Sequence, residues 1–90
     1  MAKKRERLEV IYDILSAIRD DGNRIKPTRL LHKSNLSPQM FKEYVSEMNK
    51  KGFLAEQGEA GKRHYSLTDK GFRFLEQYKV IVKFIDDFGL

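Results

Sequence analysis

Three polar side chains near the middle of the chain have types and a spacing that suit hydrogen bonding to one shared ligand. Gln39, Lys42 and Ser46 are separated by three and then four residues, so a helix would present them on one face. Such side chains reach base edges or phosphates when a helix enters the major groove of double-stranded DNA. Glu43 and Glu47 disfavour tight docking there, because carboxylates would lose hydration beside like charge. The alternative is a solvated helix face without a ligand.

Basic residues upstream of this segment indicate a second set of phosphate contacts. The stretch from residue 22 to residue 41 has no acidic residue and contains Arg24, Lys26, Arg29 and Lys33. We expect Thr28 and Arg29 to contact phosphates, since side chains and amides at the start of a helix hold phosphates and set the register of a reading helix. Ser37 is a further residue that we expect to contact DNA. A solvated basic helix is the alternative.

A third candidate set lies where two glycines permit a hairpin. Lys62, Arg63 and His64 follow Gly58 and Gly61. A flexible basic hairpin can enter a minor groove or lie along the DNA backbone, and we favour contact with the backbone. Glu56 and Glu59 cancel much of the positive charge, so an ordinary solvated turn is the alternative.

Catalysis, metal binding and cofactor binding find little support. The chain has no Cys and two His, so a metal site lacks its usual ligands, and we expect His32 and His64 at the surface. Adjacent aspartates at positions 20–21 and 86–87 fall at predicted helix ends, where turning and solvation explain them. No phosphate-binding glycine loop and no Ser-His-Asp set is evident. We predict a protein that is not an enzyme and has no cofactor, metal or small-molecule ligand.

Length and charge are consistent with a small binding module. The chain has 90 residues, enough for one core, and 18 Lys and Arg against 13 Asp and Glu, a formal charge of +5. This balance favours polyanionic partners, nucleic acid first, although it can also serve solubility alone. The charged start lacks a signal peptide, and no apolar run is long enough to span a membrane. We expect a soluble, cytoplasmic, nucleoid-associated protein without a membrane partner.

Helix start and stop residues divide the chain into four helices and a hairpin. Apolar periodicity predicts a first helix over Leu8–Asp20, and Pro27 starts a second that runs to about Lys33. After a three-residue turn, Ser37 caps a third helix that runs to about Lys51, which completes a helix-turn-helix. Its predicted buried row is Phe41, Val45 and Met48. Gly52 ends the third helix, and Ile25 is expected to be extended.

The remainder of the chain predicts two strands and a long helix. Phe53–Gln57 and Arg63–Leu67 form the hairpin, and Thr68 caps a helix that runs to about Phe88, or ~30 Å. We expect Phe72 and Leu75 to pack on their own domain. The helix outreaches so small a domain, which leaves Tyr78, Ile81, Val82 and Ile85 to a second chain. The predicted dimer interface consists of Phe74, Tyr78, Ile81, Val82, Ile85 and Phe88.

Several segments together resemble a known family. Lys26–Ser37, Lys51–Leu54 and Tyr65–Gly71 resemble archaeal winged-helix regulators. The whole chain, including its opening and Phe84–Leu90, is more closely similar to ten-kilodalton archaeal winged-helix DNA-binding proteins. The resemblance implies a chromatin or regulatory factor that dimerises through a C-terminal antiparallel coiled coil.

These observations predict a mainly α-helical winged helix-turn-helix domain over residues 1–68 and a dimerisation helix over residues 69–90. The predicted function is that of a homodimeric, double-stranded DNA-binding protein, either a chromatin-associated factor or a transcriptional regulator. A winged helix that serves only as a protein interaction module is the first alternative, and the two acids of the third helix are consistent with it. RNA binding is less favoured, because no open sheet bearing aromatic side chains is evident for stacking bases.

Overall fold

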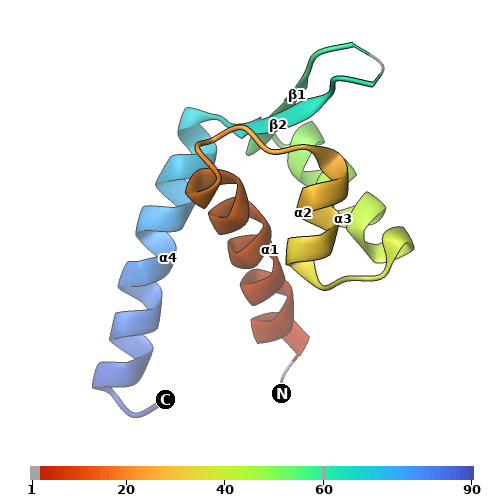
Figure 1. The fold of residues 1–90 in the computed structure, drawn as a ribbon. Coiled ribbons are helices and arrows are strands. Elements are labelled where there is room, and N and C mark those ends of the chain that lie inside the picture. The colour runs from red at the N-terminus through yellow and green to blue at the C-terminus, as the bar shows by residue number, and fades with distance from the viewer. Residues whose placement is uncertain (1–2, 60) are drawn as a thin grey trace.

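Figure 1 shows the fold of the computed structural model, which describes residues 3–59 and 61–90, with side chains from residue 7 onward. The elements are α1 (Lys3–Asp20), α2 (Pro27–Ser34), α3 (Pro38–Lys50), β1 (Leu54–Gln57), β2 (His64–Leu67) and α4 (Asp69–Asp87). This order confirms the predicted one, and most bounds agree within one residue. The exception is α1, which begins at Lys3 and not at Leu8, because Lys, Arg and Glu are good helix formers.

Capping side chains and left-handed residues fix the helix ends as predicted. The Ser37 Oγ accepts a hydrogen bond of 3.2 Å from the Met40 amide at the start of α3. The Thr68 Oγ1 accepts one of 3.2 Å from the Gly71 amide at the start of α4. Gly52 follows α3 with a φ of +81°, a conformation that glycine adopts without strain.

The core is centred on α1, which contacts α2, α4 and β2. Its side chains Ile14, Leu15 and Ile18 have no solvent exposure, and residues from every other element join them. The predicted buried row of α3 is confirmed, since Phe41, Val45 and Met48 are all buried. Leu8, which begins the apolar pattern of α1, differs from these residues: its side chain is exposed, because it lines an open groove between α1 and α4.

The two strands pair antiparallel, with Leu54 opposite Leu67 and Gln57 opposite His64. Ile25 adds a bridge on the other side of β2, where it and Tyr65 exchange two backbone hydrogen bonds of 2.8 and 3.1 Å. This confirms the extended conformation predicted for Ile25. The turn between α1 and α2 is therefore fixed to the base of the hairpin, which positions α2 and α3 relative to it.

The first half of α4 belongs to the core. Gly71 and Leu75 are buried, and a Cβ at Gly71 would lie 2.2 Å from the Phe53 carbonyl oxygen, so the close approach requires glycine. Phe72 was expected to pack here, but its side chain is exposed. Phe74 instead packs edge-to-face on Phe53, with ring centroids 5.7 Å apart, because the core side of the helix runs through Gly71, Phe74 and Leu75.

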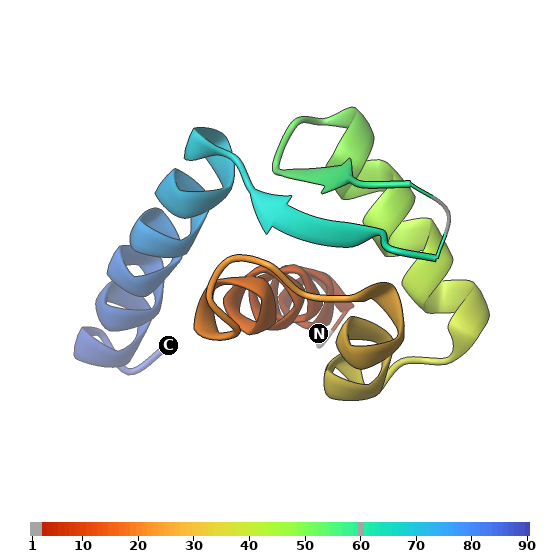
Figure 2. The ribbon, with the colours of Figure 1, turned by 45° about the horizontal axis from the view of Figure 1, so that its top comes forward.

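The second half of α4 is exposed to solvent. Figure 2 shows α4 on one side of α1, with α2 and α3 on the other side. From Lys79 to Leu90 every residue is exposed. Among the described residues, no helix has both the length and the apolar character that crossing a membrane requires. The division of the chain at residue 68 falls at the start of α4 and stays a prediction.

Candidate nucleic-acid interface

The outer face of α3 carries the three polar side chains that the sequence singled out. Gln39, Lys42 and Ser46 are exposed, on the side of the helix away from its buried row. Lys50 is exposed four residues after Ser46 and shares this face, although the sequence reasoning missed it. The helical spacing of the sequence would have been enough to identify Lys50. The face therefore offers two amine and two neutral hydrogen-bonding groups on a helix that protrudes from the domain.

The acids of α3 differ in what surrounds them. Glu43 is exposed, whereas Glu47 forms ion pairs with Arg7 of α1 and with Lys51, the latter at 2.9 Å. Hydrogen bonds from Arg7 and then Lys51 lower the pKa of the Glu47 carboxyl below its usual value. Arg7 was missed because the pair joins residues forty positions apart, and no local pattern marks it. The charge of Glu47 is thus compensated within the protein.

The residues expected at α2 are exposed but already partly engaged. Arg29 donates from Nε to both Oδ atoms of Asp21 at 3.1 Å, while Thr28 is exposed beside it. Ser37 is also exposed, and its hydroxyl oxygen serves as the cap of α3. A phosphate that bound Arg29 would share it with Asp21 or displace Asp21.

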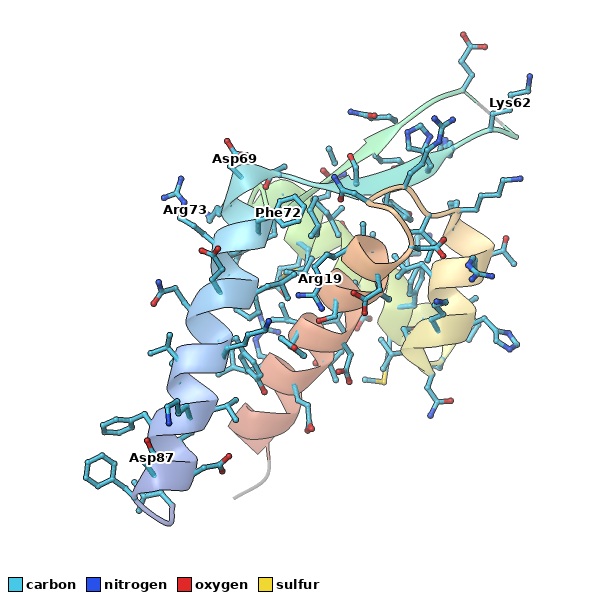
Figure 3. The ribbon with its side chains drawn as sticks, turned by 60° about the vertical axis from the view of Figure 1, so that its left-hand side comes forward. Arg19, Lys62, Asp69, Phe72, Arg73 and Asp87 are labelled. Carbon is cyan, nitrogen blue, oxygen red and sulfur yellow. The ribbon has the colours of Figure 1, made fainter. Side chains whose placement is uncertain are left out.

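The hairpin places its three basic candidates in different settings. Lys62 is exposed at the tip, the part of the molecule farthest from the end of α4 in Figure 3. Arg63 donates from Nη1 to Glu56 Oε2 at 3.0 Å across the two strands. His64 is half-buried, with its Nε2 3.3 Å from the Gln57 Oε1.

A cleft of about 320 Å³ separates α3 from the hairpin. It brings together three of the predicted residues, Lys42, Ser46 and Arg63, and leaves Thr28, Arg29 and Lys62 outside its lining. The full lining is Phe41, Lys42, Val45, Ser46, Asn49, Glu56, Arg63 and Tyr65. Burial, and then the charge of Glu56, raise the pKa of the Tyr65 hydroxyl above its usual value. Asn49, seven residues after Lys42, is a second site residue that helical spacing would have indicated.

Comparison with known proteins identifies the family of this chain. A family model described as winged helix-turn-helix matches residues 4–85. The chain belongs to the winged helix-turn-helix family. The β1–β2 hairpin is therefore the wing, α2 and α3 form the helix-turn-helix, and α3 occupies the position of the recognition helix.

Solved structures share this fold at low sequence identity. One is the crystal structure of Sso10a-2, a DNA-binding protein from Sulfolobus solfataricus, with a TM-score of 0.74 and 21% identity over 90% of this chain and 82% of that one. Another is a putative transcriptional regulator from Pseudomonas aeruginosa, with a TM-score of 0.65 and 18% identity over 84% of this chain and 57% of that one. No curated protein matches the sequence.

A second surface of the winged-helix chain lies between α1 and the exposed second half of α4, residues 79–87, which we call the free half. Tyr78 stacks on Tyr12 of α1 with ring centroids 4.5 Å apart, so the expectation that Tyr78 lies beyond the reach of its own domain is wrong. The reason is that α1 and α4 are in contact, a packing of elements that spacing along the sequence does not reveal. Between them lies a groove of about 600 Å³ with an apolar floor and an acidic rim. Its lining includes Leu8, Tyr12, Tyr78, Val82 and Ile85, with Glu9, Asp13 and Asp86 among them.

The opposite edge of the same helix is apolar and uncovered. Ile81, Phe84 and Phe88 recur at three and four residues and are exposed, and Val80 is exposed beside them. Phe84 and Val80 were absent from the predicted interface, although Phe84 fits the same spacing. No group of three or more potential metal ligands occurs among the residues that the structure describes.

Proposed function

We propose that this chain is a homodimeric, double-stranded DNA-binding protein. The observation that carries the proposal is the polar outer face of α3, with Gln39, Lys42 and Ser46 exposed beside a wing that carries Lys62 and Arg63. In this proposal α3 lies in the major groove, and Lys62 and Arg63 contact the backbone or minor groove. The winged-helix family and the DNA-binding character of one structural neighbour support DNA binding in general.

Phosphate contacts at the start of α2 would orient the recognition helix. Thr28, Arg29 and Ser37 are exposed, and His64 lies in β2, the strand that supplies Tyr65 to the cleft beside α3. Contacts to phosphates fix position but carry no sequence information, so Gln39 is the residue proposed to discriminate between base pairs. The cellular role is that of a chromatin-associated factor or a transcriptional regulator, which implies a cytoplasmic, nucleoid-associated location.

The free half of α4 supports the dimer. Ile81, Val82, Ile85 and Phe88 are exposed large apolar side chains on one helix, and such a patch is rarely left in water. Covering them in both chains contributes on the order of 10 kcal/mol before the costs of association. Phe74 and Tyr78 would border this contact from the domain side. We assign residues 69–90 to dimerisation and residues 1–68 to DNA binding.

Charge along α4 favours an antiparallel pair. Lys83 pairs with Asp87 within the helix at 3.3 Å, and Lys79 and Asp86 are also exposed. An antiparallel arrangement brings Lys79 of one helix toward Asp86 of the other, whereas a parallel arrangement places like charges together. The two wings would then lie at opposite ends of the dimer. Because one chain is 47 Å long, the recognition helices can be one DNA turn, ~34 to 36 Å, or more apart, on one duplex or on two.

The experiment is a salt series of binding to double-stranded DNA. If the dimer neutralises about 4 to 8 phosphates, log affinity falls against log salt with a slope of about −4 to −7. A slope near zero, or no binding at low salt, would contradict DNA binding. That result would favour the second candidate, a protein interaction module, for which the intramolecular pairing of Arg29 and Arg63 with acids is the specific support.

A further inference from the structure

Arg63 and Glu56 form an ion pair at the mouth of the cleft between α3 and the wing. The Arg63 side chain is 58% exposed and the Glu56 side chain 28%, so the guanidinium faces solvent and the carboxylate lies behind it. Both side chains line the cleft. The arrangement places a guanidinium with unused N–H donors toward the space next to the recognition helix.

The other side of the cleft supplies complementary groups. Lys42, Ser46 and Asn49 of α3 line it, and each can donate a hydrogen bond to an anionic oxygen. The apolar part of the lining consists of the buried residues Phe41, Val45 and Tyr65. The volume of about 320 Å³ lies at the small end for ligand sites, suited to a compact anion and not to a large cofactor. Glu56 is the one carboxylate in the lining, and it occupies Arg63.

We propose that this cleft binds a single phosphodiester of the DNA backbone, and that Glu56 is an internal competitor that holds Arg63 until the phosphate displaces it. The proposal rests on the DNA-binding function proposed above and specifies one contact within it. Exchange is favourable because a phosphate accepts two N–H donors from a guanidinium, while an exposed ion pair contributes little to stability. The competitor also makes the contact conditional, since only an anion that reaches Lys42 and Arg63 together replaces it.

The test compares two neutralised acids in the same wing. Glu56→Gln removes the competitor, and Glu59→Gln removes the same charge from an exposed position outside the cleft lining. Full-length dimers are titrated into a labelled random-sequence duplex at low salt. We expect Glu56→Gln to bind about 5-fold more tightly than wild type and Glu59→Gln less than about 2-fold more tightly, because only the first frees a phosphate ligand. Equal gains would overturn the proposal, because they would show a general charge effect.

A double-mutant cycle with Arg63 separates the competitor from a merely structural residue. In an Arg63→Gln background, Glu56→Gln should increase DNA affinity no more than Glu59→Gln does, because there is no Arg63 guanidinium left for the loss of Glu56 to release. A gain that persists would overturn the proposal. Thermal unfolding of each variant checks that the wing remains folded. If wild type itself fails to bind DNA, the proposed function fails as well; if wild type binds and the cycle shows no coupling, only the cleft assignment fails.

Inorganic phosphate tests the source of the anion. At matched ionic strength, we expect phosphate to compete with DNA no better than chloride, because an isolated ion lacks the neighbouring contacts of a duplex. Competition specific to phosphate that disappears in Arg63→Gln would assign the cleft to free phosphate and overturn the assignment to the DNA backbone.

Discussion

The apolar rows of α3 and α4 have similar spacing but opposite surroundings. On α3, Phe41, Val45 and Met48 are buried, whereas on α4 the row that begins with buried Leu75 continues into exposed Val82 and Ile85. α3 packs against α2 and β1, while the first half of α4 contacts α1 and β2 and its second half faces α1 across an open groove. Periodicity therefore identifies the apolar face of a helix, and the neighbouring elements decide whether that face belongs to the core or to a partner.

The exposed faces differ in the same way. α3 presents amide, amine and hydroxyl groups to solvent, which suits a polar ligand with fixed hydrogen-bonding positions. α4 presents aliphatic and aromatic side chains, which suits another apolar surface. Figure 3 shows Lys62 of the wing and Asp87 of α4 at opposite ends of the molecule, so the two surfaces can be occupied at once.

The largest effect that separates the two helices concerns folding. Met48→Ala should lower the free energy of unfolding by about 2 to 5 kcal/mol, because a side chain with 1% exposure leaves a cavity. Phe84→Ala, at 56% exposure, should change the stability of the monomer by less than about 0.5 kcal/mol. Urea unfolding measures both free energies, at protein concentrations low enough to dissociate the proposed dimer. Equal losses would show that α4 is held by its own domain.

The next largest effect concerns association. Val82→Asp should weaken the dimer about 100-fold or more, because each chain would bury an unpaired charge. Phe72→Asp is the matched control: both wild-type side chains are 38% exposed, but Phe72 lies near the start of α4, outside the apolar patch at its end. Sedimentation velocity should show Val82→Asp as a monomer with weaker DNA binding and Phe72→Asp as a dimer. A dimeric Val82→Asp, or a wild type that is monomeric at micromolar concentration, would refute the α4 interface.

Local signals predicted most of the fold. The caps Ser37 and Thr68 and the terminator Gly52 determined where helices begin and end, because their effects depend on nearby backbone groups. The expectation that Phe72 packs on its own domain was wrong for a physical reason. The missing side chain of Gly71 lets α4 approach Phe53 at that position, and Phe72, one position further along the helix, lies away from this contact. Spacing alone does not reveal where such a close approach occurs.

Pairings across the fold were beyond prediction. Two interactions join residues that are far apart in the sequence: the stacking of Tyr78 on Tyr12 and the ion pair of Arg7 with Glu47. No local pattern links the members of either pair. The candidate DNA residues were found by type and spacing, but the ion pairs of Arg29 and Arg63 depend on which acids the fold brings near. Their effect on DNA affinity therefore required the structure.

The wing should contribute affinity that does not depend on sequence. Lys62→Ala/Arg63→Ala should weaken binding to all duplexes about 10-fold at low salt and make the salt slope less steep, because phosphate contacts are lost. Arg73→Ala serves as control, since Arg73 lies at the start of α4, away from the wing tip (Figure 3). Fluorescence anisotropy on several unrelated duplexes measures the effect. Equal weakening by Arg73→Ala would indicate that overall charge, and not the wing, binds DNA.

The polar face of α3 should contribute a smaller and uneven effect. Gln39→Ala should weaken binding about 5-fold on the duplex that binds best and little on others, because a base-edge contact is worth about 1 kcal/mol or more only where the matching base is present. Binding to selected and random duplexes, measured in parallel, tests this. A uniform loss would place Gln39 on the backbone and indicate architectural binding.

The smallest expected effect lies in the groove between α1 and α4, where Asp13 is an acid beside an apolar floor. Burial, and then the nearby charge of Glu9, raise the pKa of the Asp13 carboxyl above its ordinary value of 3.8. Because the folded-state pKa is the higher one, the contribution of Asp13 to stability is greatest below about pH 3.8 and is lost as the pH rises through the folded-state value. Asp13→Asn should therefore match wild type at low pH and be more stable near neutral pH, by at most about 0.5 kcal/mol. Chemical unfolding of dilute monomer across this range measures the difference, and a variant less stable than wild type at neutral pH would show that the charge of Asp13 supports the fold.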